Sequence, residues 1–174
     1  MLTLTKRIDS APSSDAELVL PYELREKSRL RATMSNGEEA ALLLPRGTVL
    51  RGGDLLSGDD GRVVKIVAAP EAIYRVECHD ADEFARCAYH LGNRHTPVHI
   101  IGDLDGHYTL RMREDKVLAD MLKGLGAHVT LEQAPFEPES GAYGHGGGGG
   151  HHHHGDDMHD HAHAPRIHSA VSHK

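Results

Sequence analysis

Residues 89–95 read Tyr89-His90-Leu91-Gly92-Asn93-Arg94-His95, and the rest of the chain is interpreted outward from them. A helical spacing of apolar residues runs into Leu91. Gly92 and Asn93 stop helices because both tolerate the left-handed conformation at low cost. Pro97 prevents the helix from resuming, so His95 lies on a turn just past the helix end. A histidine on a turn is more often a surface residue than a ligand, so this stretch alone does not assign it a role.

The segments around this stretch alternate strands with helices. Asp80 can cap the helix that leads to Leu91, with Glu83 as its reciprocal partner. A second helix opens at Glu114 and Asp115, and strands are predicted at 73–77, 98–101, 108–112 and 128–131. The order β-α-β-β-α-β predicts a ferredoxin-like sandwich, in which two helices pack on one face of an antiparallel sheet. Its exposed sheet edge and open face favour dimerisation.

Residues 2–69 are predicted to be rich in β-strands. Turns containing Gly and Asp separate short apolar strands, a pattern typical of a small barrel or sandwich, at 2–8, 17–20, 40–44, 48–50, 55–56 and 62–68. Residues 22–33 fit either an alternating strand or a short helix. Their charged residues are assigned to a solvated face: Glu23, Arg25, Glu26, Lys27, Arg29 and Arg31. This half contains no histidine and no cysteine, and it offers no catalytic constellation.

The C-terminal residues have a different composition. An extended segment, Pro135-Phe136-Glu137-Pro138-Glu139, is followed by a low-complexity stretch of Gly, His, Asp and Ala. Such a stretch cannot bury enough apolar surface to offset the entropy of ordering it. The predicted fold class is therefore α+β, with a small all-β domain at 1–69, a ferredoxin-like domain at 70–144 and a disordered Gly/His-rich tail at 145–174.

Charge and composition exclude several classes of protein. The formal net charge is −7, which argues against nucleic-acid binding because such proteins present basic patches to phosphate. No apolar run approaches the roughly 20 residues that cross a bilayer, and residues 1–10 contain no export signal. Cys78 and Cys87 are too few for a secreted disulfide scaffold, and Cys87 is predicted to lie in the core. A reduced, cytoplasmic protein is the simplest interpretation.

Histidine is distributed very unevenly. The chain contains 16 histidines, and ten of them lie in the last 30 residues. Imidazole suits nickel, copper and zinc, and histidine-rich tracts indicate metal binding. A cloning tag would be an uninterrupted run, and histidine is a poor choice for a merely solvating tail at neutral pH. We therefore predict metal capture by the tail, through His145, His151, His152, His153, His154, His159, His161 and His163.

The folded part of the chain offers fewer candidate ligands. Its six histidines are His79, His90, His95, His99, His107 and His128. No HExxH or CxxC pattern fixes a closed site among them, and each one alone is more often structural or solvated. If the domain dimerises about a two-fold axis, one histidine near the axis supplies two ligands. Such a site would be open, as a donor of metal requires.

Several motifs resemble one known family. They are Leu44-Pro45-Arg46-Gly47, Gly53-Asp54-Leu55, Tyr89-His90-Leu91-Gly92-Asn93-Arg94-His95, Val117-Leu118-Ala119-Asp120-Met121-Leu122, Pro135-Phe136-Glu137-Pro138-Glu139 and Gly141-Ala142-Tyr143. In this order and spacing the sequence closely resembles the urease accessory protein E (UreE) family, the nickel metallochaperones of urease maturation. The resemblance extends to Tyr143, and a histidine-rich tail is a common feature of the family.

The resemblance implies roles for particular parts of the chain. It implies an N-terminal peptide-binding domain and a homodimer formed through the second domain, with His95 as the principal nickel ligand in each subunit. His145, just after the Gly-Ala-Tyr motif, corresponds to a further ligand in some members. Some relatives carry an auxiliary histidine site just before the second helix. The corresponding residues here are Glu114-Asp115-Lys116-Val117, and neither His99 nor His107 matches that site. The family also binds zinc and copper.

The expected function is therefore that of a cytoplasmic Ni(II)-binding chaperone and not of an enzyme. It would capture nickel and pass it to the urease accessory GTPase and to apo-urease, for nickel insertion. One alternative is a nickel or zinc storage protein that acts through its tail. Another is a metal-dependent hydrolase, which would need a closed ligand set and a general base that one chain does not offer.

Overall fold

The computed structural model describes residues 1–104 and 107–140, without the side chains of 103, 104 and 107. Residues Met1–Gly141 form one compact unit. The predicted tail, including every tail histidine named above, lies outside the described residues. In the described part of the chain, no helix combines the length and the apolar character needed to span a membrane.

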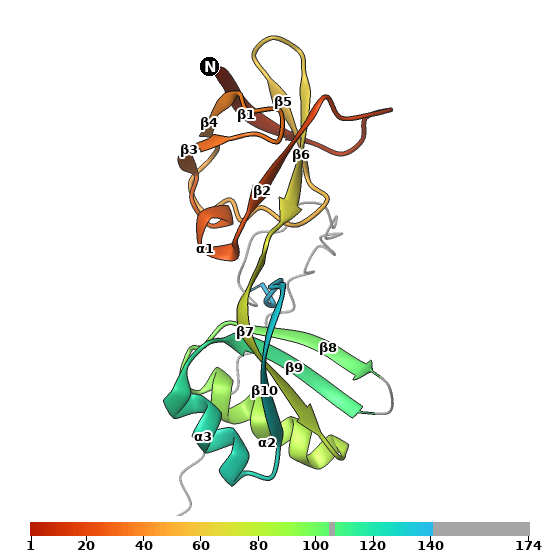
Figure 1. The fold of residues 1–174 in the computed structure, drawn as a ribbon, viewed down its shortest axis with the longest axis vertical. Helices are drawn as coiled ribbons and strands as arrows, with labels where there is room; N and C mark the ends of the chain where they lie inside the picture. Colours follow the sequence, from red (N-terminus) through yellow and green to blue (C-terminus); the bar gives the residue numbers. More distant parts are fainter. Residues whose placement is uncertain (105–106, 141–174) are drawn as a thin grey trace, which may run out of the picture. The chain divides into compact units, whose positions relative to one another are not determined.

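The N-terminal strands form a single six-stranded sheet in the order β2-β6-β5-β1-β4-β3 (Figure 1). β1 is parallel to β4, and β2 is parallel to β6, while the other neighbours are antiparallel. The strands are β1 (Leu2–Ile8), β2 (Ala16–Leu20), β3 (Arg29–Thr33), β4 (Glu39–Leu43), β5 (Leu55–Gly58) and β6 (Val63–Ala68). The predicted barrel or sandwich is thus one mixed sheet.

Alternating side chains from the strands of this sheet meet in one core. Fully buried members include Leu4, Leu18, Leu42, Leu56 and Ile66. The sheet curves around them, and just past β3 the Ser35 amide donates to the carbonyl of Glu17 in β2 (2.8 Å). Contacts between distant strands decide this curvature, which a pattern of short strands does not specify.

Two local predictions in this half need correction or completion. The predicted strand at 48–50 is not a strand. The undecided segment 22–33 contains both alternatives, since a one-turn helix, α1 (Tyr22–Arg25), precedes β3. The solvated face predicted for its charges is wrong for Arg25, which is completely buried.

The second sheet contains four antiparallel strands in the order β10-β7-β9-β8 (Figure 1). The β-α-β-β-α-β order predicted from the sequence is observed. Its elements are β7 (Pro70–Cys78), α2 (Ala81–Gly92), β8 (Val98–Leu104), β9 (His107–Arg113), α3 (Lys116–Gly124) and β10 (His128–Pro135).

Side-chain caps fix the beginnings of both long helices. The Asp80 carboxylate accepts the Glu83 amide hydrogen at 2.8 Å, as the sequence predicts, and Asp115 accepts that of Leu118 at 3.0 Å. Such caps are worth about 1 kcal/mol each because they satisfy otherwise unpaired amides. At its other end α2 stops at Gly92, next to the turn that carries His95.

The helices and the sheet share a second apolar core. It contains buried Val76, Leu91, Leu110 and Leu122, together with both cysteines. The prediction that Cys87 belongs to the core is confirmed. Burial, together with the neighbouring Cys87, raises the pKa of Cys78 to about 12. A thiol with so high a pKa remains protonated at neutral pH and is a poor metal ligand.

Candidate metal centre

His95 lies in the turn that ends α2. The amide of Thr96 donates to the carbonyl of Leu91 (3.2 Å), and the amide of His95 donates to that of Gly92 (2.9 Å). These two bonds are those of a Schellman motif, in which one residue takes the left-handed conformation. That residue is His95.

The backbone of His95 is unusual for a histidine. Among the non-glycine residues that the structure describes, His95 alone has a positive φ, at 54°. A side chain in this conformation costs about 1–2 kcal/mol, and glycine is the usual occupant. The sequence indicated Gly92 and Asn93 as the residues suited to the left-handed conformation, but Asn93 is right-handed, with φ −65°. The strained left-handed position of this turn is therefore occupied by His95 and not by a glycine.

The imidazole of His95 is exposed. Within residues 1–104 and 107–140 it has no hydrogen-bonding or ionic partner, so both ring nitrogens can reach an ion. No three His, Cys, Asp or Glu side chains in the described part of the chain are grouped as a metal site would need. The described part of one chain therefore offers a single candidate ligand at this turn, His95.

The structure does not bring the other candidate histidines to His95 as a ligand cluster. His79 is exposed and contacts Glu83 through Nδ1, at 3.1 Å. The ring of His90 packs edge-on against Tyr89, with centroids 5.3 Å apart, and His128 is exposed on β10. The side chain of His107 and the whole of His145 lie outside the described residues.

His99, on β8, is engaged within the protein. Its Nδ1 accepts the Glu137 amide hydrogen at 3.2 Å, and its ring packs against buried Phe136. Burial, with a contribution from Arg111, lowers the pKa of His99, which favours the neutral ring. A neutral ring that accepts at Nδ1 carries its proton on Nε2, so His99 has no open nitrogen for a metal.

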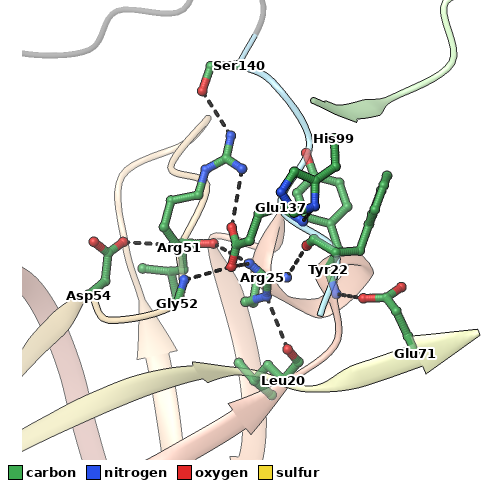
Figure 2. A network of polar contacts seen from close by, with 12 residues as sticks. Leu20, Tyr22, Arg25, Arg51, Gly52, Asp54, Glu71, His99, Glu137 and Ser140 are labelled. Atoms are coloured by element: carbon green, nitrogen blue, oxygen red, sulfur yellow. Dashed lines mark hydrogen bonds and ion pairs between the residues drawn. The ribbon is translucent and has the colours of Figure 1, made fainter. Parts of the chain in front are cut away.

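Residues 136–140 are held by a buried polar network (Figure 2). Arg25, at the end of α1, donates to the carbonyls of Leu20 (3.1 Å), Leu50 (3.2 Å) and Phe136 (2.6 Å). It also donates to Oε1 of Glu137 at 2.8 Å. These four bonds satisfy a guanidinium that has no access to water, which explains why a charge is tolerated there.

Glu137 is the centre of this network. Besides Arg25, its carboxylate accepts from the Gly52 amide (2.9 Å) and from Arg51 (3.3 Å). A Cβ at position 52 would lie 3.0 Å from the same oxygen, so a larger residue there would press on the Glu137 carboxylate. Arg51 also donates to Ser140 at 2.9 Å. The segment is thus fixed on both sides of Glu137.

The same segment lies against the strand that follows His95. The Glu139 amide donates to the carbonyl of Val98, the first residue of β8, at 2.8 Å. His145 is six residues beyond Glu139, a span of at most about 20 Å when extended. The last described part of the chain therefore runs close to the turn that carries His95.

Comparisons with known proteins agree with this two-part construction. Residues 4–69 match the N-terminal domain of the UreE urease accessory protein, and residues 71–163 match its C-terminal domain. The chain belongs to the UreE family. The family resemblance drawn from the motifs is therefore confirmed, and the family's name describes an accessory protein of urease.

Relatives of this UreE family member cover most of the chain. Urease accessory protein UreE of Nitrosospira multiformis is 58% identical over 95% of this chain and 89% of the relative. The protein of the same name from Janthinobacterium sp. is 58% identical over 83% and 82%, and that from Pseudomonas putida is 51% identical over 82% and 86%.

Sequence reasoning missed the network around Arg25 and Glu137. The segment Pro135-Phe136-Glu137-Pro138-Glu139 entered only as a motif of the UreE family, without a structural role. A proline-flanked acidic residue and a charged helix turn 112 positions apart carry no pairing signal by themselves. Only the arrangement of the chain brings them together.

Proposed function

We propose that this protein is a nickel-binding metallochaperone that captures Ni(II) and delivers it for assembly of the urease metallocentre. The exposed, unpartnered imidazole of His95 in a left-handed turn carries this proposal. Strained positions persist where the surrounding structure imposes them, and they cluster at functional sites. A ligand that is exposed and free of internal bonds can be exchanged, as delivery of a metal requires.

A homodimer would complete the site. Two His95 residues, one from each subunit, would face each other across a two-fold axis in the 70–144 domain, for which we propose a ferredoxin-like fold. Two large apolar side chains on the flanking elements support an interface near His95. Tyr89 on α2 is 68% exposed and Ile100 on β8 is 44% exposed, and exposed apolar groups of this size favour association.

The tail from residue 145 would collect further ions. His145 would join the ion at His95, while the remaining tail histidines, His151–His154, His159, His161 and His163, would bind nickel weakly, and zinc or copper as well. We propose that residues 1–69 bind peptides and that the whole chain acts with the urease accessory GTPase and apo-urease. We propose the cytoplasm as its location. Neither nucleic acid nor a membrane is among the proposed partners.

Nickel titration of the full chain, with mass determination under native conditions, tests this proposal. His95→Ala should remove the tightest nickel site and leave the dimer, because the imidazole supplies a ligand and no internal contact. His128→Ala, which removes an exposed histidine on β10, is the matched control and should leave the tightest site intact. Unchanged tight binding in His95→Ala would refute the assignment.

Storage is the second candidate, because ten histidines in the last 30 residues could buffer nickel or zinc by themselves. A urease maturation assay with the accessory GTPase separates the two functions. Delivery predicts that a chain truncated after Tyr143 still supports maturation and that His95→Ala does not. Storage predicts the reverse dependence.

A further inference from the structure

We propose that Arg94 is a positioning residue for nickel binding, because its guanidinium bonds the carbonyl of His90 and thereby holds the turn in which His95 is left-handed. This inference rests on the proposed function. It adds to that function a residue that orients the candidate ligand without itself binding the metal.

The carbonyls at the C-terminal end of α2 show why a further donor is needed there. The amide of Asn93 donates to the carbonyl of Tyr89 (2.9 Å), as the α-helical pattern requires. The amide of Arg94 departs from that pattern, because it donates to the carbonyl of Leu91 (3.0 Å) and not to that of His90, four residues back. Within the described residues, no backbone amide is bonded to the His90 carbonyl.

The side chain of the same arginine supplies the missing donor. Nη1 of Arg94 donates to the His90 carbonyl at 3.1 Å. The last carbonyls of a helix have no partner within the helix, and a basic side chain at the C-terminal end can satisfy one of them. The guanidinium therefore completes the hydrogen bonding of the helix end.

The amide and the guanidinium of Arg94 are alternative donors to one carbonyl, and they favour different backbones. If the amide bonded His90, α2 would continue by another residue and His95 would follow in a right-handed conformation. With the guanidinium on that carbonyl, the amide bonds Leu91, and the amides of the next two residues close the Schellman motif. The side-chain bond therefore favours the turn in which φ of His95 is 54° over a longer helix.

The direction of the His95 imidazole depends on which of these two backbones forms. The Cα–Cβ bond leaves a left-handed and a right-handed residue in different directions, so only the observed turn presents the ring as the structure shows it. When a binding-competent conformation is only partly populated, the affinity falls by that fraction. Since the left-handed position is strained, loss of one hydrogen bond should shift the turn toward the longer helix.

Charge by itself predicts the opposite effect of Arg94. A guanidinium close to a bound divalent cation repels it, so removing the guanidinium should, through charge alone, strengthen nickel binding. The positioning role predicts weaker binding after the same removal. The sign of the change in nickel affinity therefore separates the two effects.

The experiment measures nickel affinity by competition titration of the full chain. Arg94→Met, which removes the donor, should weaken the tightest site roughly two- to five-fold. Arg94→Lys, which keeps a donor on a long side chain, should restore most of the affinity. Arg86→Met removes an exposed arginine elsewhere on α2 and should leave the affinity unchanged. Unchanged or higher affinity in Arg94→Met would overturn the proposal.

An NMR measurement on the metal-free chain tests positioning without nickel. The nuclear Overhauser effect between the amide and α protons of one residue is strongest at positive φ, so that of His95 should be strong in the wild type. It should decrease in Arg94→Met and recover in Arg94→Lys. Thermal unfolding should change little, because Arg94 is exposed. A nuclear Overhauser effect as strong in Arg94→Met as in the wild type would also overturn the proposal.

The proposed function and this inference can fail separately. If His95→Ala leaves nickel binding unchanged, the proposed function fails. If His95→Ala removes the tightest site while Arg94→Met binds nickel as tightly as the wild type, only this inference fails.

Discussion

His95 and His99 are four residues apart, and their surroundings are opposite. His95 is exposed, occupies a strained left-handed position and has no internal partner among the described residues. His99 is half-buried, bonded at Nδ1 and packed on Phe136. The same side chain is thus prepared for an external ligand in one place and used as an internal acceptor in the other. Residue type alone does not distinguish a candidate metal ligand from an anchor. What distinguishes them is whether the ring nitrogens are already engaged in hydrogen bonds within the protein.

The largest effect is expected in the network that holds residues 136–140 beside His99. Arg25→Met removes the guanidinium that satisfies three carbonyls and the Glu137 carboxylate. Losing these four bonds at a buried site should lower the free energy of unfolding by about 3 kcal/mol. Urea denaturation measures this free energy. The control is Arg29→Met, which replaces an exposed arginine on β3 and should change the free energy of unfolding by less than about 0.5 kcal/mol. Equal stability of the two variants would show that the network contributes little.

A substitution of His95 should change the free energy of unfolding in the opposite direction. His95→Gly relieves the left-handed backbone, a gain of about 1–2 kcal/mol that the greater freedom of glycine in the unfolded chain reduces by about 0.5–1 kcal/mol. The variant should therefore be as stable as the wild type or up to about 1.5 kcal/mol more stable, while it loses the tightest nickel site. His95→Ala, which keeps the strain, should not gain stability. Thermal unfolding of both variants without metal decides between strain and an unnoticed stabilising contact.

The smallest expected effect is the pH dependence that arises from His99. Its pKa is lower in the folded chain than the ordinary 6.5, so the unfolded chain binds more protons just below that pH. The free energy of unfolding should therefore be highest above about pH 6.5 and decrease as pH falls through that value. The groups that act on the ring are Arg111 and Arg51, which lower its pKa, and Glu137 and Glu139, which raise it. In His99→Asn the decrease should be shallower, which urea denaturation at a series of pH values measures.

Local signals predicted the second half of the fold well. Asp80 caps its helix as expected, the second helix begins directly after Asp115, and Cys87 lies in the core. These features depend on neighbours three or four positions away, which the sequence states directly. The N-terminal half was less predictable, because pairing of β1 with β4 and of β2 with β6 joins distant segments. The burial of Arg25 depends on such pairing too, and its charge suggested the opposite.

The sequence by itself determined the family, the order of strands and helices in residues 70–135, and His95 as the leading candidate ligand. It did so because motifs, caps and apolar periodicity are local properties. Tertiary structure alone decided that His99 is an acceptor and that Glu137 joins Arg25. Each of those outcomes depends on which backbone groups reach a side chain across the fold, and a linear pattern does not encode that distance.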